Sequence, residues 1–378
     1  MASSSQSRPH FASRLGFVFA AAGSAVGLGN IWGFPTQVAN HGGGAFIAIY
    51  IAVLLVLAVP ALYAELSIGF HARANPVDAL TLSCPGAPKL GRVLGLTSIF
   101  AAIMMLGFYN ILAGWMLAHA AGSVFELFGW SDAYQFVTQN SIARNLIFSG
   151  LVVALTASII LAGVQRGIET WSKRLMPLLL ALLICLIIYV LTLPGALLGL
   201  TQFLAPDTAV FSEPKLYLAA MGQAFFSLSV GVGGMMIYSS YLRKNENLSK
   251  LTFSVAGLDT LVAILAGLLI IPALFAAKHV GLTIMSNGEL IGRSQLIFEV
   301  LPALFSGISW FGILLGAAFF GLMSIASITS TISSCEVPVS YLTESQNMTR
   351  RKAVLLYQST LICAHSARVK MAYIKAYC

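Results

Sequence analysis

The chain alternates long apolar runs with short polar stretches. Each run is long enough to cross a hydrocarbon core of about 30 Å as an α-helix. Strands of a membrane barrel would instead be about ten residues long and would alternate in polarity. The pattern therefore predicts a bundle of about eight spanning helices, at residues 15–39, 43–70, 93–122, 145–162, 176–193, 216–241, 251–277 and 308–343.

The composition supports a lipid environment. Of the 378 residues, 58% are hydrophobic and 9% are charged, whereas charged residues make up about a quarter of a typical soluble domain. The first 14 residues are polar and contain no signal peptide of their own. The five cysteines form no CxxC and the histidines form no HExxH, so we expect neither structural disulfides nor a transition-metal site.

The net charge of +8 is explained by the predicted topology, because Lys and Arg gather in the loops on one side of the membrane. With the N-terminus inside the cell, the cytoplasmic loops carry 14 Lys and Arg residues, the outside loops carry four and the tail carries three. Such a bias is the positive-inside pattern. It predicts a multi-pass protein of the cell's inner membrane with a cytoplasmic N-terminus, and it leaves no charge surplus that would call for a nucleic-acid partner.

Two predicted spans contain sequence that a continuous lipid-facing helix avoids. The first has three glycines and an asparagine within residues 23–30, followed by Pro35, and the sixth has the Ser- and Gly-rich stretch 227–234. Glycine costs about 1 kcal/mol relative to alanine inside a helix. Close packing of helices through Gly23 and Gly27 is one explanation. Paired breaks five spans apart favour another, a mid-membrane binding site that offers helix ends to a carboxylate and free carbonyls to a cation.

Acids within spans are costly and are candidates for function. They are Glu65, Asp259 and Glu336. Glu65 and Glu336 have an equally good structural interpretation, as acceptors for backbone groups released at the breaks. The eighth span has a run of hydroxyl side chains at residues 327–334. These hydroxyls either bond to carbonyls one turn back or serve as hard oxygen ligands for an alkali cation.

Several segments together resemble the neurotransmitter:sodium symporter family, in particular its bacterial sodium-dependent amino-acid transporters. They are Arg14-Leu15-Gly16, residues 23–35, Gly42 to Phe46, 107–115, 223–241, 259–272 and 329–336. The resemblance covers about residues 8–352. It implies an all-α polytopic membrane protein with five-plus-five inverted repeats and with helices 1 and 6 broken.

Under this resemblance the second repeat is incomplete. Residues 1–14 would be a cytoplasmic segment, 15–193 the first repeat with spans 1–5, and 194–352 a partial second repeat with spans 6–8. Residues 353–378 would be an aborted ninth span and an atypical tail, because only about 12 apolar residues follow Arg351 where about 20 are needed. We therefore interpret the chain as C-terminally truncated.

The resemblance also implies the site residues. One sodium site would use Ala25, Asn30, Ser227 and Asp259 together with the substrate carboxylate. A second sodium site would use Gly23, Val26, Ala326, Thr329 and Ser330. The substrate pocket would comprise Ala25, Leu28, Gly29, Met105, Tyr109, Phe226, Ser227, Ser229, Val232, Ser330 and Ser334. A cytoplasmic gate would comprise Arg8, Phe11, Tyr241 and Glu344.

Two departures from other family members refine the expected substrates. Gly27 stands where carriers of biogenic amines place an aspartate, so the resemblance favours an amino acid. Ala263 stands where some bacterial members carry a glutamate in place of chloride. We therefore expect Asp259, with Glu65, to balance charge and transport to be independent of chloride.

The sequence thus predicts sodium-coupled symport of a neutral amino acid, apolar or aromatic, into the cell by alternating access. The alternatives are a truncated fragment or substrate sensor that does not transport, and a proton-coupled amino-acid transporter. An enzyme is not expected, because no activated nucleophile or metal constellation accompanies the acids. The expected partners are the amino acid and the lipid bilayer, and the sequence leaves the oligomeric state open.

Overall fold

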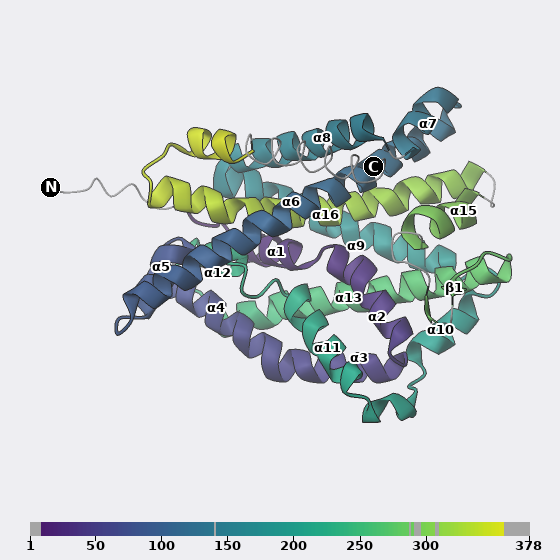
Figure 1. Ribbon diagram of the computed structural model, residues 1–378, viewed down its shortest axis with the longest axis horizontal. Coiled ribbons are helices and arrows are strands. Elements are labelled where there is room, and N and C mark those ends of the chain that lie inside the picture. Colours follow the sequence, from purple (N-terminus) through teal and green to yellow (C-terminus); the bar gives the residue numbers. More distant parts are fainter. Residues whose placement is uncertain (1–8, 140, 287–288, 291–295, 307–309, 359–378) are drawn as a thin grey trace, which may run out of the picture.

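Long helices that run in roughly the same direction form the fold (Figure 1). The computed structural model describes residues 9–139, 141–286, 289–290, 296–306 and 310–358. Within these residues six helical segments are long and apolar enough to cross a membrane. They are α3–η2–α4 (Gly44–Val53, Leu54–Ala58, Val59–Ala72), α6 (Pro88–Leu127), α8 (Ile142–Leu161), η3–α9 (Val164–Glu169, Thr170–Val190), α13 (Leu248–His279) and α16 (Trp310–Glu344).

The first predicted break is present. The first span consists of α1 (Arg14–Ala25), the π-helical turn η1 (Gly29–Gly33) and α2 (Phe34–Asn40). Its two halves are bent by 53°, and together they make a seventh span. Ser13 starts α1, because its hydroxyl accepts the Gly16 N–H as an N-cap.

The sixth predicted span is divided as well. It forms α11 (Pro214–Ser227) and α12 (Gly234–Ser240), neither of which is long enough to cross a membrane alone. The backbone between them has positive φ at Ser229 (51°), Gly231 (90°) and Gly233 (86°). Two of these three positions are glycine, which adopts this conformation without steric cost. An all-α bundle with its first and sixth spans broken is thus the observed architecture.

Short elements lie at the two ends of the bundle. Figure 1 shows α5 (Pro76–Ser83) at one end and α7 (Ser131–Thr138), α10 (Ala196–Leu204) and α15 (Leu301–Ser306) at the other. Also present are η4 (Thr208–Ser212), η5 (Leu296–Val300) and the antiparallel strands β1 (Met285–Ser286) and β2 (Glu289–Leu290), which pair Met285 with Leu290. The predicted inside and outside loops therefore lie at opposite ends.

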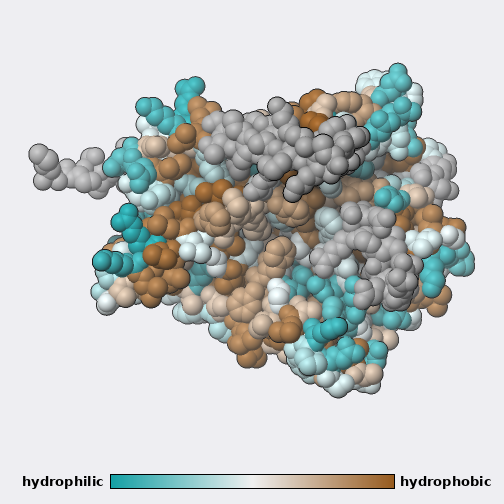
Figure 2. Space-filling view, viewed as in Figure 1, coloured by the Kyte–Doolittle hydropathy of each residue, from teal (hydrophilic) through white to brown (hydrophobic). Residues whose placement is uncertain are grey.

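The exterior is apolar between these ends. In Figure 2 hydrophobic residues form a broad area left of the centre of the visible face, and hydrophilic residues gather at its two ends and at its lower right. Val56, Phe100 and Ile188 are more than 60% exposed. A belt of large exposed apolar side chains fits contact with lipid and not with water.

The fifth span starts earlier than predicted, at Val164 and not at residue 176. The helix continues through a charged segment because Glu169 has nearby donors. Its carboxylate accepts hydrogen bonds from the backbone N–H of Ala12 (2.6 Å) and the hydroxyl of Ser13 (2.9 Å), and it pairs with Lys173 (2.6 Å). Apolar periodicity alone does not detect a helix end that is stabilised in this way.

Candidate functional site

The break in the first span releases backbone groups at the centre of the bundle. In a continuous helix the N–H groups of Gly27 and Leu28 would bond to the carbonyls of Gly23 and Ser24. Here the Gly27 N–H bonds to Asn30 Oδ1 (3.2 Å) and the Leu28 N–H bonds to the hydroxyl of Tyr109 (2.8 Å). The two carbonyls therefore lose their helical donors and become available to other partners.

Three polar side chains from three helices meet beside this break. Asn30 Nδ2 donates to Ser227 Oγ (2.9 Å) and to Asp259 Oδ1 (2.8 Å), and Ser227 Oγ donates to Asp259 Oδ2 (2.6 Å). All three residues are at most 1% exposed, and Ala25 at the end of α1 is 5% exposed. Carboxylate, amide and hydroxyl oxygens are hard ligands. The side chains assigned to the first sodium site are thus close together, and their chemistry fits a hard cation.

The residues assigned to the second sodium site also lie together, between α1 and α16. Ser330 Oγ is 3.2 Å from the carbonyl oxygens of both Val26 and Ala326, and Thr329 Oγ1 is 3.0 Å from that of Ala326. A Cβ placed on Gly23 would lie 3.3 Å from Thr329 Cβ. Both hydroxyls bond to carbonyls of their own helix, and Ser330 reaches the broken helix too. Carbonyls and hydroxyls form the kind of oxygen set that an alkali cation uses.

Gly27 and Gly29 are in tight contact with predicted pocket residues. A Cβ on Gly27 would lie closer than 3.0 Å to the Tyr109 hydroxyl and 2.7 Å from Ser330 Oγ. A Cβ on Gly29 would lie 2.6 Å from the ring of Phe226, which is 53% exposed. Any side chain at either position would displace a neighbour. Both glycines are therefore required for close approach of the backbone.

For the other predicted pocket residues the structure shows fewer contacts with the breaks. Ser229 donates to the Ser24 carbonyl (3.4 Å) across the two breaks. Ser334 is 8% exposed and lies one helical turn after Ser330 in α16. Met105 and Val232 are partly buried and pack against the hydrophobic core. Their contact with a substrate stays a prediction.

Glu65 stabilises the second break. Its carboxylate accepts the Gly231 N–H (2.7 Å) and the Met236 N–H (3.3 Å). The structural interpretation of Glu65 is therefore confirmed, while its part in charge balance stays a prediction.

Gln223 also contacts the first break, although the sequence did not mark it as a site residue. Its side-chain amide donates to the Gly29 carbonyl (3.0 Å). The only signal for it in the sequence is a polar residue within an apolar span.

The predicted gate residues lie at the end of the bundle where the N-terminus enters. The Phe11 N–H bonds to the Tyr241 carbonyl (3.0 Å), and the two rings are 6.5 Å apart. Glu344 Oε2 accepts the backbone N–H of Asn75 (2.7 Å). Arg8 lies outside the described residues.

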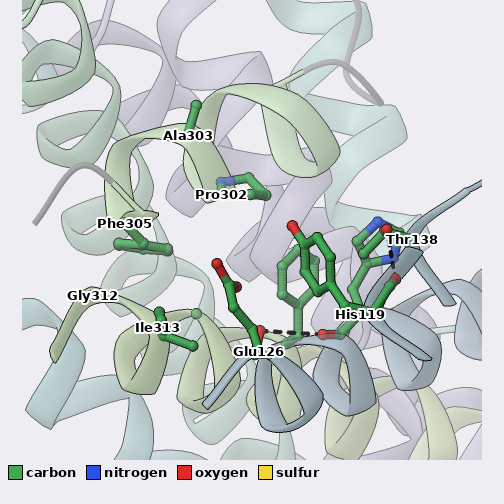
Figure 3. Close-up of a pocket in the computed structure, with 12 residues that line it drawn as sticks. His119, Glu126, Thr138, Pro302, Ala303, Phe305, Gly312 and Ile313 are labelled. Atoms are coloured by element: carbon green, nitrogen blue, oxygen red, sulfur yellow. Dashed lines mark hydrogen bonds between the residues drawn. The ribbon is translucent and has the colours of Figure 1, made fainter. Parts of the chain in front are cut away.

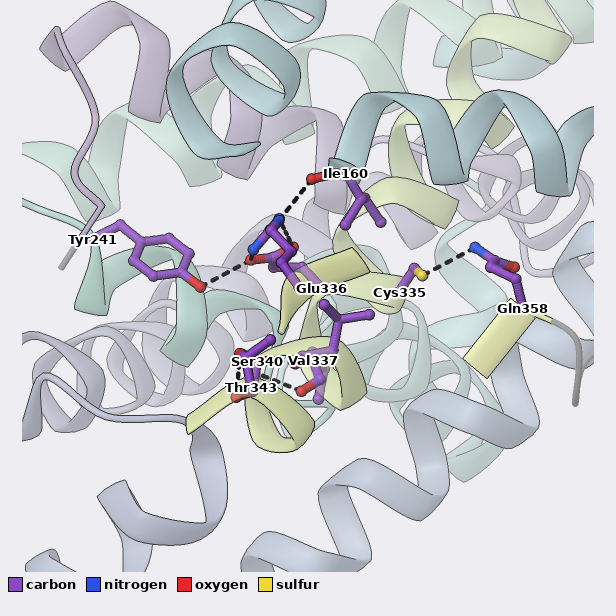
Figure 4. Close-up of polar contacts among 10 residues, drawn as sticks. Ile160, Tyr241, Cys335, Glu336, Val337, Ser340, Thr343 and Gln358 are labelled. Carbon is purple, nitrogen blue, oxygen red and sulfur yellow. Dashed lines mark hydrogen bonds and ion pairs between the residues drawn. The ribbon is translucent and has the colours of Figure 1, made fainter. Parts of the chain in front are cut away.

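Glu336 has a partner that the sequence analysis did not identify. It was interpreted as a possible acceptor for released backbone groups, but it forms a two-pronged ion pair with Arg350 (Nη1–Oε1 3.0 Å, Nη2–Oε2 2.6 Å). Tyr241 donates to the same carboxylate (2.9 Å), and Arg350 Nε bonds to the Ile160 carbonyl (2.7 Å) (Figure 4). Burial by itself lowers the pKa of Arg350, but Glu336 raises it above its usual value, so the guanidinium stays charged. The prediction that released backbone groups bond to Glu336 was therefore wrong. Its carboxylate is paired instead with Arg350, which follows α16 in the chain.

Comparison with known proteins places this chain in a family. The family model for the sodium:neurotransmitter symporter family matches residues 8–147 and 137–375. An uncharacterized sodium-dependent transporter of Haemophilus influenzae is 34% identical over 94% of the chain and 78% of its own length. The sodium-dependent transporter YhdH of Bacillus subtilis, also uncharacterized, is 35% identical over 92% and 76%.

A more distant transporter and a solved structure are also similar to this chain. The sodium-dependent neutral amino acid transporter B(0)AT2 of Bos taurus is 27% identical over 75% of the chain and 43% of its own length. The crystal structure of MhsT in complex with L-phenylalanine superposes with a TM-score of 0.81 at 37% identity, and it covers 96% of this chain and 80% of that one. The chain therefore belongs to the sodium:neurotransmitter symporter family, whose members are sodium-dependent membrane transporters and not enzymes.

Proposed function

We propose that the protein binds a neutral amino acid with an apolar or aromatic side chain, together with sodium, between its two broken helices. It then carries both into the cell by alternating access. The observation that supports this most is the buried cluster of Asn30, Ser227 and Asp259 beside the released backbone of the first span. The cluster offers oxygens to a cation, and the Tyr109 hydroxyl, which accepts from the Leu28 N–H, keeps its own proton as a donor for a carboxylate.

Two sodium ions are proposed as co-transported substrates. One lies among Ala25, Asn30, Ser227 and Asp259, where the carboxylate of the amino acid completes its ligands. The other lies between the backbone carbonyls of Gly23 and Val26 and the α16 set of Ala326, Thr329 and Ser330. Both sets join a broken helix to an intact one. Sodium binding would therefore hold the two parts of the fold in one relative position.

The proposed substrate class follows from what surrounds Gly27. No anionic side chain stands at this position, and the tight contacts of Gly27 with Tyr109 and Ser330 leave no room for one. We therefore expect backbone carbonyls and hydroxyls to accept from the amino group of a substrate here, and sodium and Tyr109 to bind its carboxylate. MhsT is known in complex with L-phenylalanine, and B(0)AT2 carries neutral amino acids by name. Phe226, Met105 and Val232 would contact the substrate side chain.

Chloride is proposed to be unnecessary. Asp259 is fully buried, and its carboxylate accepts hydrogen bonds from Asn30 and Ser227, two of the three other members of the first sodium set. Ala263, one turn later in α13, is also fully buried. A fixed carboxylate at Asp259, supported by Glu65, would then supply the negative charge that offsets sodium. Uptake that needs chloride in the wild-type protein would contradict this.

The membrane orientation is proposed from charge. The loops with most Lys and Arg lie at the end of the bundle that carries α5, and the fewest lie at the end with α7 and α15 (Figure 1). By the positive-inside pattern the α5 end faces the cytoplasm of the cell's inner membrane. A cysteine-labelling experiment on intact cells, with one reporter in the 131–138 helix and one in the 76–83 helix, would test it.

The test of function is binding of a radiolabelled amino-acid panel to purified protein, in sodium and then in potassium at equal ionic strength. We expect one or a few neutral amino acids to bind in sodium only, and binding to be lost in Asn30→Ala and Thr329→Ala. Ser254→Ala is the matched control, since Ser254 is an exposed hydroxyl of α13 that bonds only to its own helix. Equal binding in potassium would contradict the proposal.

Uptake into proteoliposomes then separates a transporter from a sensor. Accumulation that is driven by a sodium gradient supports symport. Sodium-dependent binding without accumulation would identify a sensor, and accumulation driven by a pH gradient in sodium-free medium would identify proton coupling.

A further inference from the structure

A cavity of about 240 Å³ lies at the α7 and α15 end of the bundle, away from the breaks. It is lined by the last turns of α6, by α7, by α15 and by the start of α16 (Figure 3). Glu126 lines it and follows Tyr109 along the continuous helix α6, which separates the two by about 26 Å at about 1.5 Å per residue. The cavity is therefore distinct from the proposed amino-acid site.

The walls of the cavity are apolar on two sides. α15 contributes Pro302, Ala303 and Phe305, and α16 contributes Ile313 and Phe320 together with two glycines. Phe305 and Phe320 are buried. Drug-sized ligands occupy pockets of about 300–1,000 Å³. The smaller volume here restricts an occupant to a compact molecule.

Most polar groups of the lining are already bonded within their own helices. Ser123 donates to the His119 carbonyl (3.2 Å), and Thr138 donates to the Tyr134 carbonyl (2.8 Å). His119 Nδ1 lies 2.9 Å from the Trp115 carbonyl, so this nitrogen carries the proton and the ring is held in one orientation. These groups shape the cavity, and they leave the carboxylate of Glu126 as its available charge.

Glu126 is the one charged residue that lines the cavity, as far as the described residues show. Figure 3 shows its carboxyl group directed from α6 toward the α15 wall. It stands in the last turn of α6, where the helix macrodipole is also negative. The nearby Arg144 is not part of the lining; it bonds to the Val137 carbonyl and lies over the Trp115 ring (5.8 Å). The charge on the described cavity wall is therefore negative, and a cation is the ligand that pairs with it.

We propose that this cavity is a second ligand site, which binds a small organic amine with a compact apolar body and uses Glu126 as its counter-ion. The ammonium group pairs with the carboxylate, and the apolar body packs against Phe305, Phe320 and the ring of Tyr134. A cation over an aromatic face adds further attraction. A bare divalent ion is a poor occupant, because it requires several oxygen ligands and the described lining offers one carboxylate.

The probe is 1-adamantylamine, and its neutral counterpart of the same shape is 1-adamantanol. Binding of each is measured by isothermal titration calorimetry to the full chain in nanodiscs of uncharged lipid. We expect Glu126→Gln to weaken binding of the amine by about tenfold or more, as loss of a charge-assisted contact does. The same variant should leave binding of the alcohol unchanged. Asp132→Asn, an exposed acid of α7 outside the lining, is the control for general loss of negative charge.

A second variant tests the site independently, in case Glu126→Gln does not fold. Ile313→Trp fills the cavity without touching its charge, and we expect it to abolish binding of both probes. Amine binding that persists at a saturating concentration of the transported amino acid, and also in Asn30→Ala, supports a separate site. Equal affinity of the wild type and Glu126→Gln for the amine, or competitive displacement of the amine by the amino acid, would overturn the proposal.

Discussion

A single methyl group added at Gly27 tests the proposed amino-acid site most directly. In Gly27→Ala the new Cβ would lie closer than 3.0 Å to the Tyr109 hydroxyl and 2.7 Å from Ser330 Oγ. Neither separation is tolerable for non-bonded heavy atoms, so Tyr109 or the broken helix must move. The Tyr109 hydroxyl would then lose its place beside the Leu28 N–H, to which it is now hydrogen-bonded at 2.8 Å.

The size of the effect follows from the bond that is lost. The Tyr109 hydroxyl accepts from Leu28 and keeps its own proton for the substrate carboxylate. A hydrogen bond to a charged group contributes about 1.5–3 kcal/mol. We therefore expect Gly27→Ala to weaken amino-acid binding by about 10- to 150-fold, at about 1.4 kcal/mol for each factor of ten.

The assay is equilibrium binding of the radiolabelled amino acid to purified protein in sodium, with thermal unfolding measured in parallel without substrate. Gly257→Ala is the matched control, since nothing lies within 4 Å of a Cβ at this position in α13. It should bind normally and be as stable as the wild type or slightly more so. A folded Gly27→Ala protein with wild-type affinity would refute the assignment of Tyr109 and Gly27 to the site.

Three further outcomes are expected. Glu336→Ala should lower the free energy of unfolding by up to about 3 kcal/mol, because it leaves the largely buried Arg350 guanidinium unpaired; the double variant with Arg350→Met should recover part of this in a thermal double-mutant cycle, and no recovery would contradict the pairing. Glu65→Ala should weaken amino-acid binding several-fold, since two backbone N–H groups of the second break lose a charged acceptor; unchanged affinity would show that the break holds its shape alone. Thr329→Val should raise the sodium concentration for half-maximal binding by about tenfold, whereas Thr343→Val, which removes a hydroxyl bonded only within α16, should leave that concentration unchanged.

The break positions show how far sequence reasoning reaches. Glycines at mid-membrane depth predicted two interrupted spans, and the structure has them after Ala25 and after Ser227. The prediction succeeded because the cost of glycine in a helix is local and can be read from adjacent residues. The partners of each break were not predictable in this way. The Tyr109 hydroxyl reaches Leu28 from 81 residues away.

Glu336 shows the opposite case. The sequence marked it as a costly acid within a span, which is correct, but it gave no reason to choose Arg350 from among the many cations assigned to loops. That choice depends on where the chain returns after α16, and only packing brings the guanidinium beside the carboxylate. The start of the fifth span was missed for a related reason, since Glu169 is stabilised by residues 12 and 13.

By itself the sequence determined the membrane environment, most of the span positions, the two breaks and the family motifs, because these depend on apolar length and on neighbouring residues. The tertiary structure alone decided which distant groups satisfy each buried charge and each released backbone group. It also created the cavity beside Glu126, whose walls come from four helices. The cost of a glycine or a polar residue within a span depends on its neighbours and can be judged from a short stretch of sequence. The partner of a buried polar group, in contrast, is selected by the packing of the whole bundle.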